Sequence, residues 1–144
     1  MEMLNPASAQ TCFAPEQLHP KLPAMQYIAN KLAPLASEVM QRRYIGQGTQ
    51  AVYLLPEELL EDAYAAVRLV QSDSTVSEAV DVEAKAQIIA LAPLLAAEAK
   101  MHLAESTIPV DALVSHPAWL ALRTQAQACL RALRFDLAAW EAAQ

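Results

Sequence analysis

Glycine scarcity limits the folds open to this chain more than any other feature, because only Gly46 and Gly48 occur among its 144 residues. The tight turns of β-sandwiches and doubly wound sheets depend on glycine, which adopts positive φ angles without steric cost. Alanine, the best helix former, is abundant instead, and 55% of the residues are hydrophobic. We therefore predict an all-α protein, a single-domain helical bundle of about four main helices.

Prolines divide the chain into an arm and a body. Four of them exclude a long helix at the N-terminus: Pro6, Pro15, Pro20 and Pro23. Residues 1–23 are thus expected to form an irregular, proline-rich arm, and residues 24–144 the bundle domain. Apolar residues at helical spacing predict a first helix over 24–44, interrupted at Pro34, and a second that begins at Pro56.

The second half of the chain predicts two long helices. The sequence Thr75-Val76-Ser77-Glu78 matches a capping box, so one helix is expected over about 76–105 with a kink at Pro93. The other is expected over about 117–142, with an apolar stripe that is close to a heptad repeat. The loop between them is short, and we expect the two helices to pack as an antiparallel hairpin.

Acidic residues are concentrated in one short segment of the chain. The net charge is −6 overall, whereas residues 57–83 alone carry −7 from eight acidic residues and one base, Arg68. Helix N-termini attract acids and solvated helix faces are charged, which explains part of this pattern. The rest suggests an acidic surface for a basic protein partner, formed by Glu57, Glu58, Glu61, Asp62, Asp73, Glu78, Asp81 and Glu83.

Basic residues form two smaller candidate surfaces. On the last predicted helix, Arg123, Arg131 and Arg134 either pair with the acidic helix or make a ridge that contacts a partner or a second copy of the chain. Around the two glycines, a second recognition patch is suggested by Arg42, Arg43, Tyr44 and Tyr53. A plain helix C-terminus and turn is the alternative for that segment.

One helix face carries the only candidate ligand set. Glu98, His102 and Glu105 share a face, as metal ligands of helical bundles do. However, di-iron bundles use a Glu-x-x-His spacing on two helices, and no other predicted helix carries such a set. We expect no metal and no cofactor here, and interpret His102 as the end of a buried stripe.

The remaining features of the sequence argue against several classes of protein. No catalytic motif occurs, and the acidic charge argues against nucleic acid as a partner. No stretch is long and apolar enough to span a membrane, and the N-terminus does not resemble a signal peptide. Cys12 and Cys129 are isolated and expected to be free thiols, with Cys129 inert in the core, in a cytoplasmic protein.

The leading functional hypothesis is a non-catalytic protein-interaction module, such as an adaptor, chaperone, inhibitor or immunity-type factor, that presents an acidic surface to its partner. The alternative is a small ligand-binding bundle or enzyme with a pocket near Glu98 and His102. A homo-oligomer joined through the C-terminal helix is a third hypothesis.

Overall fold

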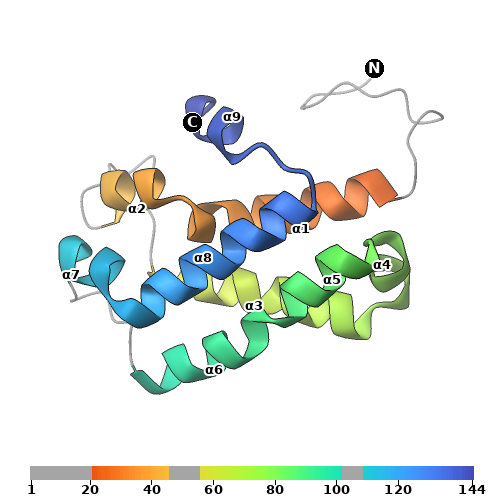
Figure 1. The fold of residues 1–144 in the computed structure, drawn as a ribbon, viewed down its shortest axis with the longest axis horizontal. Coiled ribbons are helices and arrows are strands. Elements are labelled where there is room, and N and C mark those ends of the chain that lie inside the picture. Colours follow the sequence, from red (N-terminus) through yellow and green to blue (C-terminus); the bar gives the residue numbers. More distant parts are fainter. Residues whose placement is uncertain (1–20, 46–55, 102–108) are drawn as a thin grey trace.

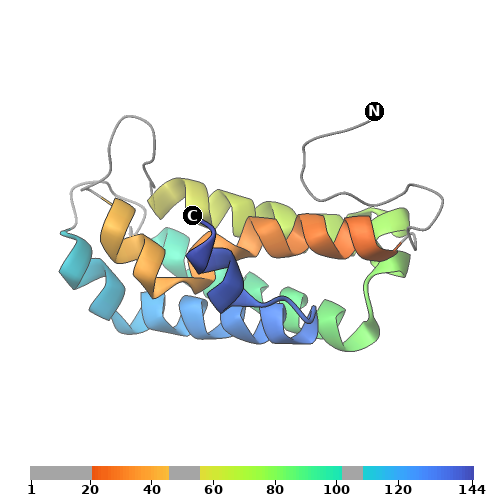
Figure 2. The ribbon, with the colours of Figure 1, turned by 90° about the horizontal axis from the view of Figure 1, so that it is seen from above.

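The computed structural model describes residues 21–45, 56–101 and 109–144. Every regular element in these ranges is a helix, which confirms the all-α class. Four helical runs lie side by side and alternate in direction, as Figures 1 and 2 show: α1 (Lys21–Ala36), α3 (Pro56–Ser72), α5 (Val82–Ile89) continued by α6 (Leu91–Met101), and α8 (Pro117–Ala132).

Short helices connect or cover these runs. They are α2 (Glu38–Tyr44), α4 (Ser74–Ala79), α7 (Val110–Ser115) and α9 (Leu137–Ala142). Around the bundle, α1 contacts α3 and α8, and both of these contact α5 and α6. The solvent side of α3 therefore forms one corner of the molecule, and the solvent side of α5–α6 forms the next.

The core lies where the four runs meet. Its largest fully buried side chains include Trp119, Ile28 and Leu122. Alanines belong to this core, and several have no exposed surface: Ala33, Ala63, Ala66, Ala84 and Ala126. Small side chains at these contacts shorten the distance between helix axes, so the abundant alanine serves packing as well as helix propensity.

The first predicted helix breaks three residues later than expected. Pro34 lies inside α1, and the break comes at Ser37, whose hydroxyl accepts a hydrogen bond from the Met40 backbone N–H at 3.1 Å and caps α2. The buried Gln41 side chain donates to the carbonyls of Pro34 and Leu35, at 2.9 and 2.7 Å. Those carbonyls end α1, so the side chain replaces the backbone donors that a continuous helix would supply.

The predicted continuous helix over 76–105 is wrong. The chain forms α4, α5 and α6 in this region, with breaks at Val80 and Ala90. Asp73 caps α4 by accepting the Val76 N–H at 3.1 Å, and so it takes the role assigned to the capping box at Thr75. The next helix, α5, begins after Asp81 and packs against α3 and α8.

The last predicted helix also ends early. α8 stops at Ala132 because Arg134 adopts a left-handed backbone conformation with φ 59°. The Phe135 N–H then bonds the Leu130 carbonyl at 2.9 Å, and the Arg134 N–H bonds the Arg131 carbonyl at 3.0 Å, as in a Schellman motif. The expected hairpin of two long helices is therefore not confirmed.

The predicted arm lies outside the described residues up to position 20, whereas Lys21–Pro23 form the first turn of α1. In the described ranges, no helix combines the length and the apolar character that a membrane crossing requires.

Candidate functional site

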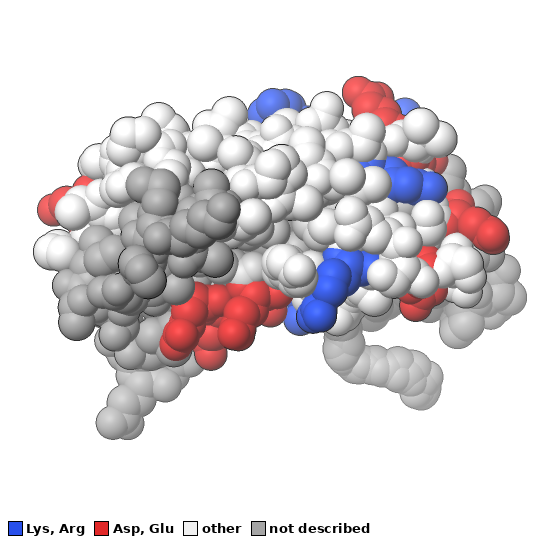
Figure 3. Space-filling view, turned by 90° about the horizontal axis from the view of Figure 1, so that it is seen from below, with Lys and Arg blue, Asp and Glu red and all other residues white. Residues whose placement is uncertain are grey.

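The structure divides the predicted acidic surface between the two ends of α3. Near its start lie Glu57, Glu58, Glu61 and Asp62, which we call the first acidic group. Beyond its end lie Asp73, Glu78, Asp81 and Glu83, the second acidic group. α3 has 17 residues and spans about 25 Å at 1.5 Å per residue. In Figure 3 the acidic side chains accordingly form separate clusters, with basic and uncharged surface between them.

Several of these acids also have structural roles. Glu57 and Glu58 lie in the first turn of α3, where the helix dipole favours negative charge. Asp62 pairs with Lys31 of α1 at 3.5 Å, and Asp73 caps α4. Because none of the eight is buried, each stays accessible to a partner.

The structure separates the three arginines of the predicted ridge. Arg123 is 7% exposed, donates to the Val114 carbonyl at 3.1 Å and pairs with Glu38 at 3.4 Å. It is therefore unavailable as an exposed recognition residue and joins α8 to α2 and α7. Arg131 and Arg134 are exposed, and with Asp81 and Glu83 they line a cavity of about 270 Å³ between α5 and α8.

The predicted patch around Arg42 has its own internal partners. Arg42 pairs with Glu38 at 2.8 Å and with Asp111 of α7 at 2.9 Å. The hydrogen bond from Arg42 lowers the pKa of Glu38 and also raises the pKa of Arg42. The Arg43 guanidinium lies over the Tyr44 ring at 5.8 Å, and Tyr53 lies outside the described residues.

The candidate ligand set cannot be assembled from the described residues. Glu98 belongs to α6, but its side chain is not described, and His102 and Glu105 lie outside the described ranges. Within those ranges, no cluster of histidine, cysteine and carboxylate side chains could hold a metal ion.

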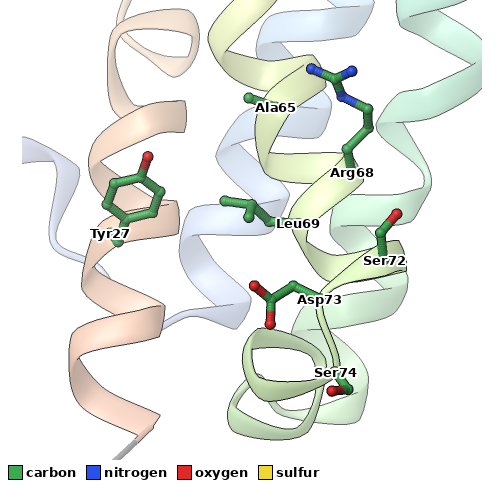
Figure 4. A pocket seen from close by; sticks show the side chains of 7 residues that line it. All are labelled: Tyr27, Ala65, Arg68, Leu69, Ser72, Asp73 and Ser74. Carbon is green, nitrogen blue, oxygen red and sulfur yellow. The ribbon is translucent and has the colours of Figure 1, made fainter.

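A surface hollow between α1 and α3 was not predicted from the sequence. Its volume is about 720 Å³, and it is lined by Tyr27, Ala65, Arg68, Leu69, Ser72, Asp73 and Ser74. In Figure 4, Tyr27 and Leu69 approach each other from the two helices, whereas the Arg68 guanidinium extends away from Asp73. The Arg68 guanidinium lies over the ring of Tyr64, at 5.0 Å from its centroid.

The outer side of α5–α6 is the other surface that sequence reasoning missed. It exposes a stripe without charge that we call the uncharged face: Val82, Ala86, Ile89, Ala90, Pro93 and Ala96. Val82 is 82% and Ile89 37% exposed, and Leu120 of the neighbouring α8 is 46% exposed. Figure 3 shows a broad uncharged area on this side of the molecule. The signal in the sequence is the absence of charged residues from 86 to 97.

The inner side of the same helices is apolar as well, because Ile88, Leu91 and Leu95 belong to the core. α5–α6 is thus apolar on both its inner and its outer side.

Searches against known protein families, curated proteins and solved structures found no match to this chain.

Proposed function

We propose that this chain is a non-catalytic interaction module that binds another protein. The observation that carries the proposal is the uncharged face of α5–α6, with Val82 and Ile89 exposed on a stripe that contains no charged side chain. Soluble monomers rarely expose contiguous apolar patches larger than a few hundred Å², and larger ones mark interaction sites.

A comparison with α3 supports this interpretation. The outer side of α3 carries Glu57, Glu61 and Arg68, the pattern of a solvated amphipathic helix. Residues 86–96 of α5–α6 carry no such charged side chain on their outer side. Burial of this apolar surface against a partner would stabilise the complex by about 25 cal/mol for each Å² removed from water.

The acidic groups indicate which charge the proposed partner should carry. Asp81 and Glu83 flank Val82, so the second acidic group borders one end of the uncharged face. A partner with an apolar centre and a basic rim would complement both features, and the acids would mainly accelerate its association. The first acidic group lies at the far end of α3 and would extend the negative electrostatic potential that attracts the partner.

The alternative function, a ligand-binding pocket near Glu98 and His102, has no support from a described contact. The hollow beside Tyr27 lies on α1 and α3 instead.

A binding experiment with matched variants tests the proposal. The immobilised chain is used to capture its partner from a lysate of the source cells, and the affinity for the purified partner is then measured. The variant Ala86→Glu/Ile89→Glu should weaken binding at least tenfold, a loss of about 1.4 kcal/mol. The control Gln26→Glu/Asn30→Glu adds the same charge at exposed positions of α1, outside both proposed surfaces, and should bind as the wild type does.

Equal affinity of both variants would refute the uncharged face as the binding surface. The acidic contribution has a separate kinetic readout. Glu78→Lys/Glu83→Lys should slow association at low salt and differ little from the wild type at high salt, because screening removes the long-range attraction. An association rate that is unchanged at low salt would show that the second acidic group is only solvated surface.

A further inference from the structure

The outer side of α3 carries an ordered pattern of side chains. Five exposed residues follow one another along a single stripe, at helical intervals of three and four: Glu57, Glu61, Tyr64, Arg68 and Gln71. Tyr64, at the centre, is 51% exposed. Acids precede the tyrosine, and a base and an amide follow it. We call these residues the α3 stripe.

The two opposite charges nearest the tyrosine have no ionic partner among the described residues. Lys31, Arg42 and Arg123 each pair with a carboxylate, whereas no carboxylate pairs with Arg68 and no cation pairs with Glu61 in the described ranges. Arg68 instead lies over Tyr64, so a guanidinium and an aromatic ring are presented together to solvent. Arginine and tyrosine are among the residue types enriched at interface hot spots.

We propose that the α3 stripe binds the α3 stripe of a second copy of this chain, antiparallel, about a twofold axis at Tyr64. Glu61 lies three residues before the axis, and Arg68 lies four residues after it. An antiparallel partner therefore places its Arg68 within about one residue rise, 1.5 Å, of Glu61. The twofold axis repeats this pair, gives two contacts between Glu57 and the partner's Gln71, and brings the two Tyr64 rings together.

The charge order selects this arrangement over the obvious competitors. A parallel pair of stripes would set Glu61 against Glu61 and Arg68 against Arg68, which is repulsive. A uniformly basic partner would meet Arg68, and a uniformly acidic one would meet both glutamates. The stripe is complementary to its own antiparallel copy.

The inference does not depend on the proposed function, because the uncharged face lies on α5–α6 at the next corner of the bundle. A dimer through α3 would leave both uncharged faces open. Two linked faces would strengthen binding to a partner that itself has two sites, through effective concentration.

The first experiment is a charge swap measured by sedimentation equilibrium. The wild type should show a monomer–dimer equilibrium that weakens at high salt. Glu61→Arg and Arg68→Glu should each weaken dimerisation at least tenfold, and the double variant Glu61→Arg/Arg68→Glu should recover it, because the swap restores both pairs. Glu83→Arg makes the same charge change on α5 and should leave the equilibrium unchanged.

A monomeric wild type at the highest soluble concentration would overturn the proposal, as would a double variant that dimerises no better than the single ones. All the substituted positions are exposed, and circular dichroism and the unfolding midpoint verify that each variant is folded. Loss of dimerisation in Ala86→Glu/Ile89→Glu but in neither single charge variant would assign the dimer to the uncharged face and also overturn the proposal.

A disulfide trap tests the register independently. In a chain with Cys12→Ser, Tyr64→Cys should form a cross-linked dimer under mild oxidation, because the twofold axis places position 64 opposite itself. Gln71→Cys is the control, since its own copy would lie about 21 Å away along the two helices, too far for a disulfide. Efficient cross-linking of Gln71→Cys, or none of Tyr64→Cys, would contradict the antiparallel arrangement.

Discussion

Gln41 shows how one buried polar side chain can fix the path of the backbone. Its amide oxygen accepts the indole N–H of Trp119 at 3.0 Å, while its amide nitrogen donates to the two carbonyls that end α1. Nearby, Gln127 donates to the Ala36 carbonyl at 3.0 Å, and Ser37 donates to Glu141 of α9. The break between α1 and α2 is thus held by side chains that come from α8 and α9. The local sequence around Gln41 does not predict this role, because its partners lie up to 78 residues away.

Replacement of Gln41 by leucine should destabilise the protein strongly. The change keeps a side chain of similar volume. It leaves two carbonyls and the Trp119 N–H without their partners, and each such group costs about 1–3 kcal/mol. We expect the free energy of unfolding to fall by about 3 kcal/mol in urea titrations. Gln71→Leu, at an exposed position of α3, serves as the control and should change it by less than about 0.5 kcal/mol. A similar small effect at both positions would show that the hydrogen bonds of Gln41 contribute little.

Cys129 should be chemically inert in the folded protein. Burial raises the pKa of its thiol to about 12, so the reactive thiolate is scarce at neutral pH. In a Cys12→Ser background, a thiol reagent should modify Cys129 only as fast as the protein unfolds, and urea should restore rapid labelling. The unfolded thiol ionises at its ordinary pKa, whereas the thiol of the folded protein keeps its proton. Stability should therefore decline as the pH rises above that ordinary value. Fast labelling of the native chain at neutral pH would contradict this account.

At the scale of helices, the sequence predicts some boundaries and misses others. α3 begins at Pro56 and α8 at Pro117, both as expected, since proline fits the first turn of a helix. The breaks at Val80 and Ala90 and the end of α8 were missed. With no glycine after position 48, the usual C-terminal signal is absent from the second half of the chain. The chain ends α8 with an arginine in the conformation that glycine favours.

That arginine offers a direct way to strengthen an element. A non-glycine residue in the left-handed region costs roughly 1 kcal/mol or more, whereas glycine adopts it freely. Arg134→Gly should therefore stabilise the protein by about 0.5–1 kcal/mol, because part of the gain is offset by the greater entropy of the unfolded chain. Thermal unfolding should show a midpoint about 2–4 °C higher. Arg131→Gly is the matched control: it removes the same side chain inside α8 and should lower the midpoint. A lower midpoint for Arg134→Gly would mean that its side chain, beside Asp81 and Glu83, matters more than its backbone.

At the scale of the whole molecule, composition was the most informative property of the sequence. The few glycines and many alanines were sufficient to predict the all-α class. The positions of the candidate surfaces were not predictable, because they depend on which sides of the helices face outward. Residues 57–83 are continuous in sequence, but α3 carries their acids to its two ends. The uncharged face could not be recognised either, because the chain has no charged residue from 86 to 97 and hydropathy alone cannot tell the outer side of this segment from its core side.

The uncharged face leads to a prediction that separates surface function from core packing. If the Ala86 side chain does not contribute to the stability of the fold, Ala86→Lys should change the free energy of unfolding by less than about 0.5 kcal/mol. The same variant should reduce the fluorescence of a dye that binds exposed apolar surface, since the new charge interrupts the stripe beside Ile89. Ala63→Lys is the counterpart on a core position with no exposed surface, and it should unfold the protein or raise dye fluorescence sharply. If Ala86→Lys also unfolded the chain, the outer side of α5–α6 would have a structural role in the monomer, and its lack of charge would no longer point to a partner.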